Sequence, residues 1–209
     1  MNFEIQSMVL GMVGTNCYLL INKDTKETVI FDPGAQGDKI VRYLQREELI
    51  PKAILLTHGH FDHIMGIPPL KEAYDLPVYI HRQEEAVMES PQLNSCAMIG
   101  ANVSYKADRL VEDGDVIREA GADIQVLFTP GHTQGGVSYY IEALHTVVCG
   151  DTLFEGSVGR TDLPTGSMGT LVRSIREKLF VLEDDVTVLP GHGGATTIGW
   201  EKKYNPFVS

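Results

Sequence analysis

Short runs of β-branched, aliphatic and aromatic residues recur along the chain, and turn-forming residues separate them. Runs of this kind are typical of β-strands. The pattern predicts strands over residues 3–9, 17–21, 28–31, 53–56, 78–80, 124–128, 137–141, 146–149 and 186–189.

Between several of these runs, apolar residues recur at helical spacing. Ile40, Val41 and Leu44 share one face of a helix expected over 37–48, and further helices are expected over 67–74 and 169–179. Short turns such as 22–26 join the early strands and predict antiparallel hairpins, whereas later strands are separated by helix-length connections. This mixture predicts an α/β protein with helices covering sheet layers, and it argues against an all-parallel doubly wound fold.

Segment 84–109 is the least regular part of the chain, because Pro91, Asn94, Gly100 and Asn102 interrupt its patterns. Two interpretations remain open. A long irregular insertion beside an active site is often a lid, and the alternative is a surface excursion that contains one helix.

The length and charge of the chain limit its function. Its 209 residues, 23.0 kDa, contain no linker-like stretch, so we expect one domain over 1–209. A net charge of −11 would repel phosphate backbones and anionic lipids, and no block of Lys or Arg offsets it. We therefore expect neither nucleic acid nor a membrane as a partner. The oligomeric state has no signal in the sequence.

The N-terminal residues lack the basic head and unbroken apolar stretch of a signal peptide. Nor does any stretch approach the ~18 apolar residues that a membrane span needs. Cys17, Cys96 and Cys149 are odd in number and widely spaced, which fits free thiols in a reducing compartment. We therefore expect a cytoplasmic protein.

Candidate metal ligands are concentrated in one run, Thr57-His58-Gly59-His60-Phe61-Asp62-His63. Imidazole nitrogens together with a carboxylate oxygen suit zinc and iron, whereas an all-oxygen set would indicate calcium or magnesium. The cysteines show no Cys-x-x-Cys spacing and are not expected to be ligands. The run predicts a metal site.

Ligand-type residues also follow three later strands, at the point where each apolar run stops. They are Gly131-His132, Gly150-Asp151 and Gly191-His192. Loops at strand ends are where sites are usually assembled, and the glycines permit close backbone approach. One histidine after a strand is ordinarily structural, but the repetition favours metal binding. His81 and His145 lack the glycine context and are expected to be structural.

These four motifs, in this order, resemble those of the metallo-β-lactamase superfamily over nearly the whole chain. The resemblance implies an α/β fold, a four-layer αββα sandwich, with the metal site at one edge of its two sheets. It also implies one metal bound by His58, His60 and His132, a second bound by Asp62, His63 and His192, and Asp151 as a bridge between the two.

Asp32, in Phe31-Asp32-Pro33-Gly34, matches a further motif of the superfamily. The resemblance implies that its carboxylate orients a ligand histidine or the loop that carries it. An Asx-type turn at the strand end is the alternative, and the two roles are compatible.

Within the superfamily the chain is similar to hydroxyacylglutathione hydrolases, the glyoxalase II group, through 150–154, 189–193, 195–199 and 205–207. The tail resembles the compact bacterial form, because the chain ends at Ser209 without the helical C-terminal region of longer glyoxalase II enzymes. The implied reaction is hydrolysis of a small-molecule thioester, glutathione-linked as in S-D-lactoylglutathione, to a hydroxy acid and a free thiol.

Loop 157–162 resembles that of the compact hydrolases and also that of persulfide dioxygenases, which bind one iron and oxidise a glutathione persulfide with oxygen. Hydrolysis of another small ester or lactone is a further alternative. Arg160 is a candidate clamp for a substrate carboxylate, or it pairs with Asp162 and braces the loop. Lys202 is a second candidate substrate contact.

The expected cofactors are two divalent cations, zinc foremost, with iron or manganese as alternatives. Two cations that share a water lower its pKa from ~16 toward neutrality, which gives a bridging hydroxide that attacks the thioester carbonyl. Asp62 and Asp151 are expected to lower the net charge of the site and position this hydroxide, without acting as covalent nucleophiles. A purely structural metal protein is the alternative, but structural zinc sites are normally closed four-coordinate cages.

Overall fold

The computed structural model describes residues 2–208, and their strands form two six-stranded sheets and a two-stranded ribbon. In the first sheet β1, β2 and β3 are antiparallel, and β3 to β6 are parallel. Its order is β1 (Phe3–Leu10), β2 (Thr15–Asn22), β3 (Glu27–Phe31), β4 (Ile50–Leu55), β5 (Val78–His81) and β6 (Arg109–Val111). The early antiparallel hairpins and the absence of an all-parallel sheet confirm the prediction.

The second sheet is also mixed. Its order is β14 (Thr196–Thr197), β13 (Thr187–Pro190), β10 (Thr146–Gly150), β9 (Val137–Ile141), β8 (Ala122–Phe128) and β7 (Val116–Glu119). Strand β9 is antiparallel to both β8 and β10, and β13 is parallel to β10. Strands β8, β10 and β13 therefore run in the same direction. The ribbon consists of β11 (Leu153–Phe154) and β12 (Ser157–Val158).

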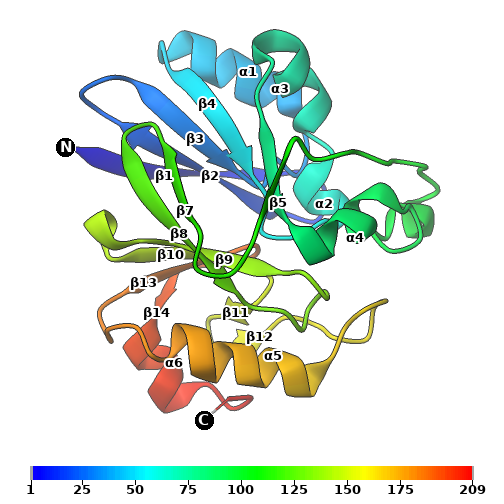
Figure 1. Cartoon of the computed structure of the whole chain (residues 1–209), viewed down its shortest axis with the longest axis vertical. Helices are drawn as coiled ribbons and strands as arrows, with labels where there is room; N and C mark the ends of the chain where they lie inside the picture. The colour runs from blue at the N-terminus through cyan, green and yellow to red at the C-terminus, as the bar shows by residue number, and fades with distance from the viewer. Residues whose placement is uncertain (1, 209) are drawn as a thin grey trace.

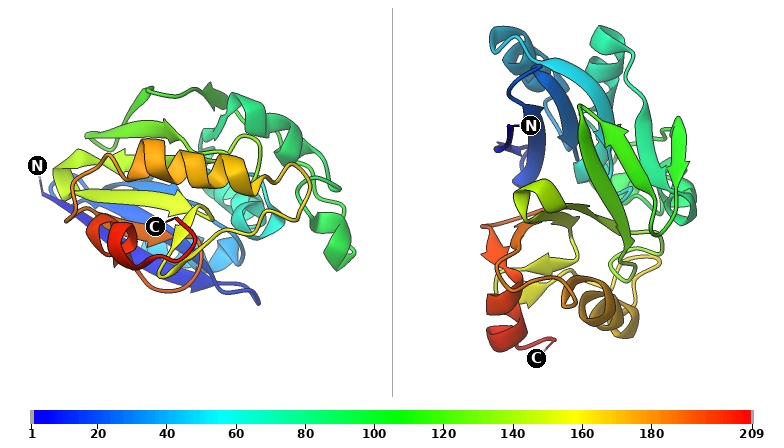
Figure 2. Two further views of the ribbon diagram at one scale, coloured as in Figure 1. Left: turned by 90° about the horizontal axis from the view of Figure 1, so that it is seen from below. Right: turned by 60° about the vertical axis from the view of Figure 1, so that its left-hand side comes forward.

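Helices cover the outer faces of both sheets, as Figures 1 and 2 show. On the first sheet lie α1 (Gly37–Arg46) and α3 (Ile67–Tyr74), and on the second lie α5 (Met168–Ser174), with its π-helical extension η4 (Ile175–Leu179), and α6 (Ile198–Tyr204). The short helices are α2 (Phe61–Ile64), α4 (Glu85–Glu89), η1 (Arg82–Glu84), η2 (Cys96–Ile99) and η3 (Glu142–Leu144). This order of layers confirms the αββα sandwich.

The alternation of side chains along each strand explains the layers. In β2, Leu19 and Ile21 belong to the core under α1 and α3, whereas Tyr18 and Leu20 belong to the core between the sheets. Successive side chains of a strand point to opposite faces, so a strand buried on both faces is apolar throughout. All of β2 is buried accordingly.

The predicted strands and the three predicted helices are present, with shifts of a few residues at their ends. The elements that the sequence did not predict are mostly short, such as β6, β11, β12, β14 and α2, and too brief to show a period. Segment 84–109 contains two short helices, α4 and η2, whereas the interpretation as a surface excursion had one. Within residues 2–208, no helix combines the length and apolar character needed to cross a membrane.

Tyr139 joins the two sheets through its hydroxyl, which donates to the carbonyl of Leu56 at 2.8 Å in the buried interior. We predict that Tyr139→Phe lowers the free energy of unfolding by about 1–3 kcal/mol, because a buried carbonyl loses its donor. Urea unfolding at equal metal content measures this change. The control is Tyr204→Phe, at a side chain that is 53% exposed. Equal stability losses in the two variants would contradict the assignment.

Candidate metal centre

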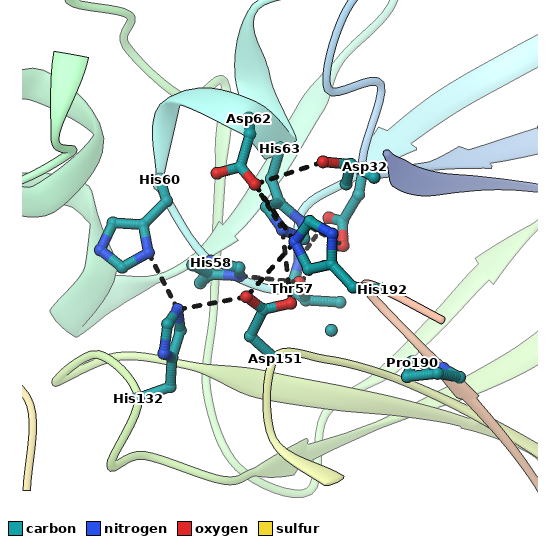
Figure 3. Close-up of polar contacts among 12 residues, drawn as sticks. Asp32, Thr57, His58, His60, Asp62, His63, His132, Asp151, Pro190 and His192 are labelled. Atoms are coloured by element: carbon teal, nitrogen blue, oxygen red, sulfur yellow. Dashed lines mark hydrogen bonds and ion pairs between the residues drawn. The ribbon is translucent and has the colours of Figure 1, made fainter. Parts of the chain in front are cut away.

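The carboxyl ends of β4, β8, β10 and β13 meet at one edge of the sandwich. Because β8, β10 and β13 run in the same direction, the residues that follow them, His132, Asp151 and His192, reach this edge together. From the first sheet, β4 and α2 deliver the histidines and aspartate of the 58–63 run to the same place (Figure 3).

The structure gathers the predicted residues into overlapping groups whose ligand atoms lie within 4.8 Å of one another. One group, the first ligand set, consists of His58, His60 and His132. Its ring nitrogens His60 Nδ1 and His132 Nε2 are 2.9 Å apart. These three imidazoles are buried, so water does not compete strongly for their lone pairs.

A second group, the second ligand set, consists of Asp62, His63 and His192. Asp62 Oδ2 lies 3.2 Å from His192 Nε2 and 3.8 Å from His63 Nε2. The Thr15 hydroxyl donates to the same oxygen at 3.2 Å and fixes the carboxylate.

Asp151 lies between the two sets, as Figure 3 shows. Its Oδ2 is 3.6 Å from both His132 Nε2 and His192 Nε2, and its Oδ1 is 3.5 Å from His63 Nε2. One carboxylate thus faces histidines of both sets, which is the position that a bridging ligand requires.

Several buried polar atoms at this centre are suited to a cation. Among the described residues, His58 Nε2, His63 Nε2 and Asp151 Oδ1 are buried at the centre without a hydrogen-bond partner. Buried polar groups ordinarily have a partner, and those without one require an explanation. Neutral imidazoles combined with carboxylates form a donor set that suits zinc, iron or manganese. The residues therefore fit a metal centre.

Hydrogen bonds on the opposite ring nitrogens orient the histidines. Asp32 Oδ2 accepts from His63 Nδ1 at 3.0 Å, and the carbonyl of Arg160 accepts from His132 Nδ1 at 2.7 Å. Asp32 also accepts from the backbone amide and hydroxyl of Thr57, at 2.8 and 2.6 Å. A proton held on Nδ1 leaves Nε2 free to bind a cation. Asp32 thus contacts both a histidine and the ligand loop.

The first ligand set favours neutral imidazoles. Burial, reinforced by the neighbouring imidazoles, holds the pKa of His58 well below its ordinary value. Burial, together with His132, lowers the pKa of His60 to about 3. These rings are ready to bind a cation at neutral pH without losing a proton.

The second ligand set has the opposite preference. Burial opposes the protonation of His63, but Asp62 and Asp32 outweigh it and raise the pKa of this ring well above its ordinary value. The hydrogen bond to Asp62 also raises the pKa of His192. In the metal-free protein these two rings therefore hold protons that a cation would have to displace.

Gly191 makes the close packing around Asp151 possible. A Cβ at this position would lie 2.2 Å from Asp151 Oδ1 and 2.8 Å from His63 Cε1. No larger residue fits there without displacing the two side chains. This steric limit explains why a glycine precedes His192.

Asn16 ties the His192 loop to the first sheet, a role that the sequence analysis missed. Its side chain donates to the carbonyls of Pro190 and Gly193, both at 3.0 Å, and its backbone N–H donates to the carbonyl of Gly191 at 2.7 Å. An asparagine at the start of a strand carries no local signal of this role, because its partners lie far away in the sequence.

Glu84, also missed, joins two ligand loops. Its fully buried carboxylate accepts from the amide of Gly59 at 2.9 Å and from that of Gly135 at 2.8 Å. Gly59 separates His58 from His60, and Gly135 lies in the loop that carries His132. Burial raises the pKa of Glu84 to about 7 although both amides favour the ionised form. The residue lies in the irregular segment, where no pattern marked it.

The other candidate residues occupy different places. Arg160 lines a cleft of about 600 Å³ beside the centre, and its guanidinium pairs with both oxygens of Asp162, at 2.8 and 2.7 Å. Lys202 lies on α6 and pairs with Asp184 at 2.7 Å, outside the lining of this cleft. His81 stacks on Phe128, and His145 lies near Asp185; neither joins a candidate ligand group.

The sequence-family model of the metallo-beta-lactamase superfamily matches residues 10–192 of this chain. The chain belongs to this superfamily. Among curated relatives, it is 43% identical over 204 residues to the probable metallo-hydrolase YqgX of Bacillus subtilis, covering 97% of this chain and 96% of the relative. It is 34% identical over 215 residues to the hydroxyacylglutathione hydrolase GloC of Haemophilus influenzae, covering 100% and 99%.

Solved structures of this superfamily share the architecture. The BLEG-1 B3 metallo-beta-lactamase has a TM-score of 0.94 at 40% identity, with 99% of this chain and 100% of that chain covered. TTHA1623, solved in a di-iron-bound form, has a TM-score of 0.86 at 39% identity, with 97% and 99% covered. ETHE1 from Myxococcus xanthus has a TM-score of 0.79 at 31% identity, with 99% and 84% covered.

We predict that Glu84→Gln lowers metal affinity by about tenfold and the free energy of unfolding by about 1–3 kcal/mol. A glutamine accepts with one oxygen and turns an NH₂ toward the second backbone amide, so one loop loses its anchor. Metal titration and urea unfolding measure the two effects. Glu89→Gln makes the same change at an exposed position and should alter neither. A Glu84→Gln protein with unchanged metal affinity would contradict the proposed anchoring.

We predict that the two zinc equivalents that bind to the metal-free protein release different numbers of protons. Near pH 7, binding at the first ligand set should release about no proton, and binding at the second about one or more. Affinity at the second set should therefore fall as the pH decreases. Calorimetric titration in two buffers of different ionisation enthalpy counts the protons. Equal release for the two equivalents would show that the two sets do not differ.

Proposed function

We propose that this protein is a metal-dependent hydrolase of a small-molecule thioester, with S-D-lactoylglutathione as the reference substrate. The observation that carries the proposal is the placement of Asp151 between two sets of ligand atoms beside an open cleft. The similarity to GloC supports the choice of a thioester.

The proposed ligands are His58, His60 and His132 for one cation and Asp62, His63 and His192 for the other, with Asp151 shared. Two cations bound there would supply a hydroxide at neutral pH and polarise the substrate carbonyl. Zinc is the proposed cation, and iron and manganese suit the same donors.

The protein's own residues position the reacting groups. The Thr15 hydroxyl holds Asp62, and both Asp62 and Asp151 lie at the cleft, where they can accept a hydrogen bond from the attacking oxygen. A bond forms between this oxygen and the carbonyl carbon, the carbon–sulfur bond breaks, and the thiolate leaves with the electron pair. A thiol has a pKa of about 8.5, so its departure requires little proton transfer.

We predict that His58→Ala and Asp151→Ala each lower kcat/KM for S-D-lactoylglutathione by at least about 10³-fold and reduce metal content per chain. His145→Ala, at an exposed histidine outside the candidate groups, is the control and should keep both activity and metal. A His58→Ala or Asp151→Ala protein that is free of metal and fully active would refute the scheme.

Persulfide dioxygenase activity is the second candidate, because loop 157–162 resembles that of these enzymes and the donor set suits iron as well as zinc. Oxygen uptake with glutathione persulfide by protein holding one iron per chain would establish it in place of hydrolysis. The substrate panel should include a lactone and a β-lactam, since BLEG-1 is named a metallo-beta-lactamase.

A further inference from the structure

The cleft beside the metal centre has largely apolar walls. Apart from the candidate ligands, its lining includes Val13, Phe61, Met98, Ile99 and Phe154. Val13 is 54% exposed, Met98 71% and Ile99 50%, although large apolar side chains are normally kept from water. Exposed apolar side chains that surround one hollow indicate a surface for an apolar ligand group.

The short helix η2, which carries Met98 and Ile99, is firmly attached to the metal centre. The buried side chain of Asn94 donates to the carbonyls of Met88 and Val103, at 3.2 and 2.9 Å, and accepts from the amide of Cys96 at 2.9 Å. The carbonyl of Asn94 accepts from the amide of Phe61, the first residue of α2. This wall of the cleft is therefore fixed relative to the ligand run.

The turn between β1 and β2 carries Val13 and is also fixed to the centre. Thr15 donates to Asp62, and the amide of Asn16 donates to Gly191, beside His192. Phe154 adds a second apolar side chain there, with its ring centroid 6.4 Å from that of His192. Apolar groups thus face the cleft from both ligand sets.

The cleft offers little to a charged substrate group. Among the described lining residues, Arg160 is the one Lys or Arg, and it already pairs with Asp162. An exposed ion pair of this kind contributes only ~0–1 kcal/mol, so Asp162 does not hold the Arg160 side chain in place. Its carboxylate nevertheless neutralises the charge of the guanidinium. Glutathione carries two carboxylates, and outside the metal centre the described lining residues provide one compensated side-chain cation for them.

We propose that the cleft binds an uncharged apolar substituent of the substrate between Val13 and the short helix η2, which carries Met98 and Ile99. The protein would then prefer apolar thioesters over thioesters of charged carriers such as glutathione. This inference rests on the proposed thioester hydrolysis and narrows its substrate class. Each methylene buried between these walls adds to binding, whereas away from the metal centre a charged carrier gains only the Arg160 contact.

The test combines turnover with binding, so that the two proposals can fail separately. Acetyl, butanoyl and hexanoyl thioesters of glutathione and of N-acetylcysteamine, an uncharged thiol, are compared by kcat/KM with zinc-loaded protein. The binding of the matching S-alkyl thioethers, which cannot be hydrolysed, is measured by calorimetry. We expect at least a tenfold gain from the shortest to the longest chain, and tighter binding of the uncharged thioether at each length.

Variants locate the effect. Val13→Ser and Ile99→Ser should each reduce the gain in kcat/KM with chain length by at least threefold. Metal content should stay unchanged. The matched control, Val181→Ser, changes a side chain that is 71% exposed and lies outside the cleft lining, and it should keep the full gain. Arg160→Gln should weaken the glutathione compounds by no more than threefold.

The outcomes are distinct. Apolar preference in thioether binding without turnover of any thioester would refute the proposed hydrolysis and uphold the apolar subsite. Turnover with a preference for glutathione compounds, lost in Arg160→Gln and unaffected by the serine variants, would overturn the subsite and uphold hydrolysis.

Discussion

Buried imidazole and carboxylate groups need partners, and the edge of this sandwich gathers seven buried or partly buried ones in one place. The surrounding structure holds them in position. Asp32 fixes Thr57 at the start of the ligand run and His63 at its end, and Glu84 joins the loops of Gly59 and Gly135. The centre is therefore assembled by buried carboxylates that are not themselves candidate ligands.

The two ligand sets differ electrostatically although both contain histidines. The first set is made of imidazoles alone, and burial keeps the pKa of His58 and His60 low. The second contains Asp62 and contacts Asp32, whose negative charges raise the pKa of His63. The two ligand sets therefore differ in proton affinity, and Asp151 lies near histidines of both.

The same two segments that complete the metal centre also form the walls of its cleft. The β1–β2 turn supplies Thr15 to Asp62 and Val13 to the cleft, and the turn after Asn94 supports Phe61 while presenting Met98 and Ile99. The walls of the cleft and the candidate metal centre are therefore structurally coupled through short backbone connections. Whether segment 84–109 moves as a lid stays a prediction, although its residues line the cleft.

The sequence alone determined the long strands, the alternation of helices and sheets, and the ligand types, because period and residue chemistry are local properties. His58 and His60 could be found in this way, and so could the strand ends before His132 and His192. Only the tertiary structure decided that Glu84 and Asn16 support the centre, and that Arg160 pairs with Asp162 while Lys202 lies on α6. These contacts depend on chain segments that fold together from distant positions, so no local pattern encodes them.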